Sequence, residues 1–303
     1  MIAKSVTIFE VGPRDGLQNE PGMVSTQAKE RLVRGLLGAG LKQIEVGAFV
    51  REDKVPQMAD TSDLIKKLSD VVAPVQLWSL VPNRKGLERA LGAGARNLAI
   101  FTAATDGFAT RNIGMTVDES FEEFKAVIAE AKRASKKIKF RGYVSTAFGC
   151  PFEGKVAAKK ALKVVERLAK LGVDQISIGD TIGVGTPNQV TDIVKPALKI
   201  LGARKLALHF HDTRGTALAN ALRALELGVT TLDASAGGLG GCPFAPGATG
   251  NLATEDLVYM LDGLGVKTGV DLNKLSEASL ALAREMKRSL SSRYLAAYAA
   301  SHS

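Results

Sequence analysis

The segment LGVDQISIGD, residues 171–180, contains the repeating unit from which the fold can be predicted. Gly172 follows an amphipathic stretch, and the apolar Ile176 lies four positions later in a run rich in β-branched residues. A glycine just past a helix end adopts the left-handed conformation at little cost, so this segment predicts a helix, a stop and a strand. The same spacing recurs three more times, at Gly40 and Ile44, Gly94 and Leu98, and Gly228 and Leu232.

Eight short apolar runs alternate with longer amphipathic stretches along the chain. We expect strands over residues 6–11, 43–48, 75–81, 97–103, 139–146, 175–180, 206–210 and 231–236. Helices are expected, among others, over residues 26–39, 61–68, 84–93 and 118–137, near 252–261, and from about 273 onward. Strands that alternate with helices form parallel βαβ units, and eight such units close into a (β/α)8 barrel of about 250 residues.

The predicted fold class is therefore α/β, a TIM barrel with extra C-terminal helices. An open doubly wound sheet is the alternative, but it normally uses fewer strands, and the turn at residues 12–16 lacks the G-x-G-x-x-G pattern. No Pro/Gly/Ser-rich linker divides the chain. We expect one catalytic domain over residues 1–303, with the barrel at about 5–263 and a C-terminal helical extension at about 264–303.

The composition argues against several classes of protein. Hydrophobic residues make up 46% of the chain and charged residues 23%, as in soluble globular proteins. No apolar run approaches the ~18–20 residues that span a bilayer, and a strand is expected almost directly after Met1, which leaves no room for a signal peptide. We therefore expect a cytoplasmic protein with no membrane partner.

The net charge of +9 has two interpretations. Basic residues are scattered over the predicted helices without a basic tail or an aromatic-lined stripe, so a solvated basic surface is favoured and nucleic acid is not expected as a partner. A phosphate-bearing substrate is the alternative. The two cysteines, Cys150 and Cys242, are too few for a disulfide framework and lack metal-type spacing.

Polar residues at strand ends form the candidate active site, because a TIM barrel builds its site at the C-terminal ends of the strands. Arg14, Asp15 and Gln18 follow the first predicted strand, and Glu45 lies on the second. Later strands contribute Arg141, Tyr143, Ser145, Asp180, Thr181, His209 and His211. Burying such groups without a purpose is costly, so the pattern predicts a functional mouth.

The pair His209 and His211 is the sharpest signal in the chain. A period of two places both imidazoles on the same side of a strand, facing the barrel interior, while Phe210 packs outward. With carboxylates nearby, this arrangement favours metal binding over a structural hydrogen-bonded pair. Imidazole and oxygen ligands suit Mg²⁺ or Mn²⁺ at least as well as Zn²⁺. Asp15 is the expected carboxylate ligand, and Asn251 is either a fourth ligand or a helix N-cap.

Two further features leave alternatives open. Four glycines within five positions precede Cys242, which indicates a mobile loop or a close backbone approach, with a cysteine that is either catalytic or incidental. A phosphate-cradling loop is a rival interpretation, but no Lys-Ser/Thr follows. Arg14 is suited to an oxyanion or a carboxylate, or else forms a surface ion pair in a turn.

Six motifs resemble those of the 3-hydroxy-3-methylglutaryl-CoA lyase family, and the likeness extends over nearly the whole chain. The motifs are long and occur in the same order, so chance agreement is excluded. They are EVGPRDGLQNE (10–20), RGYVS (141–145), GDTIGVGTP (179–187), HFHDT (209–213), GGLGGCP (237–243) and GATGNLATEDLVYM (247–260).

The resemblance implies metal-assisted retro-Claisen cleavage of the CoA thioester to acetyl-CoA and acetoacetate, a place in leucine degradation, and a homodimer. It implies that Mg²⁺ or Mn²⁺ is held by Asp15, His209, His211 and Asn251. Arg14 would stabilise the enolate oxygen, and Cys242 would protonate the enolate carbon. Glu45 and Asp180 would orient Arg14 and the metal shell, and the pocket would be lined by Gln18, Tyr143, Ser145 and Thr181.

The chain departs from the family pattern at two places, and the milder change is Thr105-Asp106 where Ser-Glu is usual. Arg51-Glu52-Asp53-Lys54 stand where Ser-Pro-Lys and an aromatic residue are usual. A lyase acting on another 3-hydroxy-acyl-CoA is therefore an alternative. A related Claisen-condensing synthase is another, although such enzymes usually carry a regulatory domain and lack the GGLGGC loop. A zinc hydrolase would need more histidines, and a non-enzymatic metal- or CoA-binding protein would not need Arg14 and Cys242.

Overall fold

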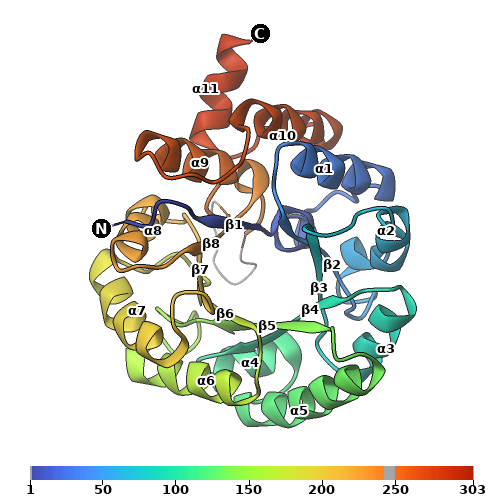
Figure 1. The fold of residues 1–303 in the computed structure, drawn as a ribbon, viewed down its shortest axis with the longest axis vertical. Coiled ribbons are helices and arrows are strands. Elements are labelled where there is room, and N and C mark those ends of the chain that lie inside the picture. Colours follow the sequence, from blue (N-terminus) through green and yellow to red (C-terminus); the bar gives the residue numbers. More distant parts are fainter. Residues whose placement is uncertain (1, 242–249, 303) are drawn as a thin grey trace.

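Eight parallel strands form a closed barrel in the computed structural model, which describes residues 2–241 and 250–302. The strands lie around the ring in chain order, and β1 closes it by pairing with β8, Thr7 opposite Thr231 (Figure 1). This confirms the predicted TIM barrel. The strands are β1 (Thr7–Glu10), β2 (Gln43–Ala48), β3 (Gln76–Leu80), β4 (Asn97–Ala103), β5 (Lys139–Ser145), β6 (Gln175–Asp180), β7 (Leu206–Phe210) and β8 (Thr231–Ala234).

Helices surround the barrel, and two more follow at the C-terminal end (Figure 1). No helix among residues 2–241 and 250–302 is long and apolar enough to cross a membrane. The helices are α1 (Thr26–Gly38), α2 (Thr61–Lys67), α3 (Arg84–Gly92), α4 (Asp106–Ile113), α5 (Val117–Ala134), α6 (Ala158–Lys170), α7 (Pro187–Leu201), α8 (Ala217–Glu226), α9 (Thr254–Gly263), α10 (Leu272–Met286) and α11 (Arg293–Ser301), with short turns η1 (Gly12–Gly16), η2 (Pro56–Met58) and η3 (Ala236–Gly238).

The alternation of side chains along the strands separates an apolar layer from a polar interior. Ile176 and Ile178 of β6 are buried in the hydrophobic core between barrel and helices. Ser177, which lies between them, donates a hydrogen bond to Asp233 of β8 across the barrel interior. Successive strand residues point to opposite faces, so one strand supplies both the core and the site.

Two helices in the connection after β4 differ from the sequence prediction. Helix α5 begins at Val117 with Thr116 as its N-cap, rather than at Asp118. Thr116 and Glu119 form a capping box, in which each side chain accepts a hydrogen bond from the other residue's backbone N–H. Helix α4 was not predicted, because its eight residues lie in the connection between β4 and α5 and lack a clear helical apolar pattern.

The four glycines of the helix–strand repeat all adopt the left-handed conformation. Their φ angles are 99° at Gly40, 89° at Gly94, 78° at Gly172 and 100° at Gly228. The predicted left-handed glycine at the end of each helix is thus confirmed at all four positions. A side chain at any of them would strain the backbone.

We predict that Gly40→Ala lowers the free energy of unfolding more than Gly94→Ala does. Both changes impose left-handed strain of about 1–2 kcal/mol on alanine. At Gly94 a new Cβ would meet no atom within 4 Å, whereas at Gly40 it would collide with the carbonyl oxygen of Gly269. Denaturant midpoints of the two variants measure the difference, and equal midpoints would contradict it.

Candidate active site

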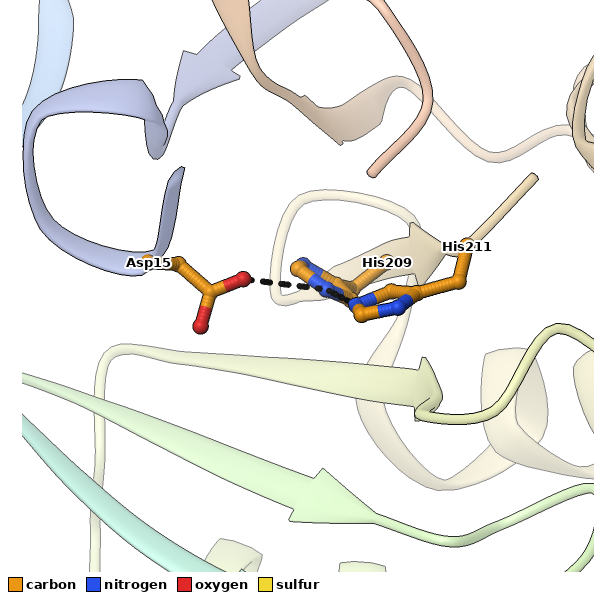
Figure 2. Close-up of side chains that lie close together, drawn as sticks. All are labelled: Asp15, His209 and His211. Carbon is orange, nitrogen blue, oxygen red and sulfur yellow. Dashed lines mark hydrogen bonds and ion pairs between the residues drawn. The ribbon is translucent and has the colours of Figure 1, made fainter. Parts of the chain in front are cut away.

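Asp15, His209 and His211 form the only group of three or more possible metal ligands of the His, Cys, Asp and Glu types found among residues 2–241 and 250–302. One ligand atom from each lies within 4.8 Å of the others, and Figure 2 shows the three side chains facing one another. Asp15 comes from η1, directly after β1, and His209 lies on β7. Both strands are neighbours of β8, so barrel closure brings them together at the C-terminal mouth.

The donor set fits a metal ion. The Nε2 atoms of His209 and His211 lie 3.1 Å apart, and His209 Nε2 lies 3.9 Å from Asp15 Oδ2. Two ring nitrogens bound to one cation at about 2.1 Å in adjacent positions are separated by about 3 Å. A hydrogen bond between the rings would use the proton of only one of them, whereas a shared cation uses both lone pairs.

Asn251 contacts the cluster through Asp15. Its Nδ2 donates to Asp15 Oδ2 at 2.9 Å and to the Leu239 carbonyl at 3.0 Å, while its buried Oδ1 has no hydrogen-bond partner. A buried amide oxygen without a partner is costly unless something binds it. The N-cap alternative for Asn251 is wrong, because α9 begins at Thr254 with Ala253 as its N-cap.

The charges at Asp15 and His211 favour cation binding, whereas at His209 burial opposes the charged ring but Asp233 and Asp15 raise its pKa. Burial opposes ionisation of Asp15, but Arg14 and the two histidines hold the pKa of its carboxyl below the usual range. Burial and the neighbouring His209 lower the pKa of His211 to about 4. At neutral pH, Asp15 is therefore a carboxylate and His211 a neutral imidazole, the protonation states that bind metals.

Arg14 lies between two carboxylates beside the cluster. Its Nε donates to Glu45 Oε2 at 2.7 Å, and its Nη1 donates to Asp15 Oδ1 at 2.7 Å. Tyr143 also donates its hydroxyl to Glu45 Oε2, at 3.1 Å. Arg14 is only 6% exposed, so the alternative of a surface ion pair in a turn is wrong. The guanidinium is held rigidly at the mouth and cannot lose its charge.

The remaining predicted pocket residues lie at other strand ends. Ser145 is buried at the end of β5, and Gln18 is half-buried after η1. Thr181 accepts a hydrogen bond from the Thr146 backbone N–H at 2.7 Å, so it orders the loop after β5. Asp180 accepts hydrogen bonds from the backbone N–H groups of Val184 and Gly185, and burial raises the pKa of Asp180 to about 6. Asp180 therefore holds the loop after β6.

The glycine-rich segment after β8 passes very close to the cluster. Gly240 has a φ angle of 106°, and a Cβ there would lie 2.6 Å from Asn251 Nδ2 and 3.2 Å from the Cα of Gly16. The backbone at Gly240 therefore lies directly against Asn251 and Gly16, and a close approach to a ligand stays a prediction. Cys242, the predicted proton donor, lies outside the described residues.

Sequence reasoning missed three buried carboxylates. Asp233 on β8 faces His209 and Arg141, and the signal for it was a charged residue inside a short apolar strand. Glu10 accepts hydrogen bonds from Gly12 and Ala236, which ties the turn carrying Asp15 to the segment after β8.

The third carboxylate, Glu255, accepts hydrogen bonds from the backbone N–H of Gly237 and from the Ser279 hydroxyl. Burial raises the pKa of Glu255 to about 8 and that of Glu10 to about 7. Glu10 and Glu255 lie within the motifs at residues 10–20 and 247–260, but no pattern in the sequence indicated that they bind the backbone of the segment after β8.

Comparison with known proteins finds relatives that match most of the chain. The family model described as HMGL-like matches residues 5–281. The mitochondrial hydroxymethylglutaryl-CoA lyase of Rattus norvegicus is 50% identical over 295 residues, which cover 96% of this chain and 89% of the relative.

Solved structures agree in fold as well as in sequence. The HMG-CoA lyase of Bacillus subtilis has a TM-score of 0.94 and 43% identity, covering 98% of this chain and 99% of that one. The HMG-CoA lyase of Acinetobacter baumannii, solved in complex with coenzyme A and 3-methylmalate, has a TM-score of 0.93 and 38% identity over 98% of this chain and 97% of that one. With this agreement and a family match over residues 5–281, the chain belongs to the HMGL-like family.

Proposed function

We propose that this protein is a carbon–carbon lyase that cleaves 3-hydroxy-3-methylglutaryl-CoA to acetyl-CoA and acetoacetate. The observation that carries the proposal is the 50% identity to a hydroxymethylglutaryl-CoA lyase over 96% of the chain. The mouth of the barrel offers the matching chemistry, a metal-ligand cluster beside a buried arginine. The coenzyme A bound to the Acinetobacter baumannii relative supports an acyl-CoA substrate here.

The metal site would consist of Asp15, His209, His211 and the amide oxygen of Asn251, and would take Mg²⁺ or Mn²⁺. The mixed oxygen and nitrogen donors and the absence of thiolates among the described residues near the cluster support these cations. When bound, the cation polarises the hydroxyl and carboxylate oxygens of the substrate and so acidifies the hydroxyl.

Arg14 would bind the thioester oxygen, where negative charge develops as the carbon–carbon bond breaks. Its ion pairs with Glu45 and Asp15 hold the guanidinium in place before the substrate arrives. Donors fixed in advance need no reorganisation during the reaction, which is why such groups stabilise oxyanions effectively. Tyr143 supports the same arrangement through its hydrogen bond to Glu45.

The reaction then requires two proton movements. A base takes the proton of the tertiary hydroxyl, whose oxygen becomes the ketone oxygen of acetoacetate as the neighbouring carbon–carbon bond breaks. The bonding electrons pass to the thioester fragment and form the enolate of acetyl-CoA. We propose that the thiol of Cys242 donates a proton to the enolate carbon, which gives the methyl group of acetyl-CoA.

The unusual loop after β2 does not by itself argue for another acyl group. Arg51 is exposed and forms an ion pair with Asp53, and Glu52 forms one with Arg89. Three of the charged residues that replace the usual family sequence are therefore paired with other side chains. Gln57 anchors the same loop by accepting a hydrogen bond from the Val24 backbone N–H. We therefore retain 3-hydroxy-3-methylglutaryl-CoA as the proposed substrate. The homodimer, the cytoplasmic location and the place in leucine degradation stay predictions of the sequence.

The substrate is tested by an acetyl-CoA release assay on a panel of 3-hydroxy-acyl-CoA thioesters. We expect 3-hydroxy-3-methylglutaryl-CoA to give the highest kcat/KM, and activity to vanish with chelator and return with Mg²⁺ or Mn²⁺. A higher kcat/KM for another panel member would overturn the substrate, and full activity in chelator would overturn the metal requirement.

We predict that His211→Ala weakens Mn²⁺ binding by more than the about 10–100-fold that loss of an outer partner of a metal ligand costs. His302→Ala is the matched control, since His302 is exposed near the C-terminus. Titration with Mn²⁺ followed by electron paramagnetic resonance measures both affinities. Equal affinities in the two variants would rule out the assigned site.

We predict that Cys242→Ala folds and binds metal but loses activity by about 10²–10⁴-fold, the usual contribution of a general acid. Cys150→Ala is the control for loss of a thiol, and it should keep most of its activity because Cys150 is buried and is not among the clustered ligands Asp15, His209 and His211. Steady-state rates check the prediction, and a wild-type rate in Cys242→Ala would refute the proton-donor role.

A further inference from the structure

We propose that Asp233 of β8 is a positioning residue that orients the metal ligand His209. Asp233 Oδ2 lies 3.3 Å from His209 Nδ1, and the two residues are direct neighbours in the register of β7 and β8. The other ring nitrogen, Nε2, points to His211 and Asp15. The two nitrogens of one ring therefore face two different partners, a carboxylate on one side and the metal cluster on the other.

This arrangement selects one tautomer of the imidazole. A neutral imidazole has one N–H donor and one nitrogen lone pair, and an ionised carboxylate can only accept. Facing Asp233, His209 keeps its proton on Nδ1, which leaves the lone pair on Nε2 for a metal ion. The 3.3 Å separation is an ion-pair distance, and the alignment of the two groups in the structure falls short of a hydrogen bond.

The carboxylate of Asp233 is itself fixed by donors from two other strands. Arg141 Nη2 of β5 donates to Oδ1 at 2.5 Å, and the Ser177 hydroxyl of β6 donates to Oδ2 at 2.9 Å. The Arg141 guanidinium lies over the ring of Phe9 from β1, 3.5 Å from its centroid. Three strands besides β7 and β8, namely β1, β5 and β6, thus contribute to holding His209 in one orientation.

Stability alone does not account for this network. Arg141 and Asp233 are almost completely buried, and a buried ion pair seldom stabilises a protein more than apolar residues of the same size would. Arg141 Nε and Nη1 also have no hydrogen-bond partner, an additional cost. A carboxylate that must stay ionised and aimed at His209 accounts for the buried arginine.

The contrast with His211 sharpens the assignment. The Nδ1 atoms of both histidines are buried and make no hydrogen bond in the structure, but only that of His209 faces a carboxylate, Asp233 Oδ2 at 3.3 Å. His211 forms no ion pair among the described residues and is placed through its backbone bridge to Asn251. Only one of the two histidine ligands therefore depends on a carboxylate for its orientation. The inference rests on the proposed metal site but not on the identity of the acyl-CoA.

The principal test is Asp233→Asn, which keeps the size of the side chain and removes its charge. We expect Mn²⁺ affinity, measured by electron paramagnetic resonance, to fall by about 10–100-fold. Asp174→Asn is the matched control, because Asp174 accepts a hydrogen bond from the Phe140 backbone N–H at the opposite end of the barrel. An Asp233→Asn protein that binds Mn²⁺ as tightly as Asp174→Asn overturns the proposal.

A spectroscopic measurement separates orientation from general damage. The chain has three histidines, so the ¹⁵N-histidine spectrum of the Mg²⁺-loaded protein can be assigned with His302→Ala and His211→Ala. We expect a proton on His209 Nδ1 in the wild type, with a signal that moves or vanishes in Asp233→Asn. An unchanged signal in that variant refutes the positioning role.

Ser177→Ala keeps the test decisive if Asp233→Asn does not fold. This variant removes one donor to Asp233 and leaves both buried charges in place, so a smaller shift of the same Nδ1 signal is expected. An unchanged signal in Ser177→Ala contradicts the proposal. Wild-type protein that shows the Nδ1 signal and binds Mn²⁺, yet cleaves no 3-hydroxy-acyl-CoA, would refute the proposed function and support the positioning role.

Discussion

Closure of the barrel between β1 and β8 is the constraint on which the rest of the structure depends. It places the turn after β1 and the end of β7 on either side of β8, so that Asp15 and His209 face each other. The same closure lets Asn251, 236 positions away in sequence, donate to the carboxylate of Asp15. An open sheet with the same strands would leave β1 and β8 at separate edges, and the ligand cluster would not form.

The mouth of this barrel is built from charges that neutralise one another in pairs. Arg14 is held by Glu45 and Asp15, and Arg141 is held by Asp233, which in turn faces His209. Isolated charges in such a buried place would be very unfavourable, so each needs its neighbour. The consequence is a rigid set of donors and acceptors whose positions are established before any substrate binds.

This preorganisation connects the fold with lyase chemistry. Cleavage next to a thioester creates negative charge on oxygen, and Arg14, held beside the cluster by Glu45 and Asp15, is the residue that we propose stabilises it. Backbone segments without side chains, such as Gly240 against Asn251, allow the loop after β8 to approach the same place. The helices and the outward-facing side chains of the strands form the apolar core, and the candidate site lies at the C-terminal ends of the strands.

The sequence by itself determined the elements of the barrel and the type of site. The left-handed glycines, the strand periodicity and the His-x-His pair are local features, and each followed from backbone sterics or from a period of two. The start of α5 at Val117 was missed by one residue, because capping by Thr116 depends on which side chains reach the free N–H groups. Tertiary structure alone decided the role of Asp233, Glu10 and Glu255, whose partners lie on other strands or distant segments. It also decided that Asn251 faces Asp15 instead of capping a helix. A buried carboxylate has a defined partner only once the chain has closed on itself, and the spacing of residues along one strand contains no information about the strand opposite.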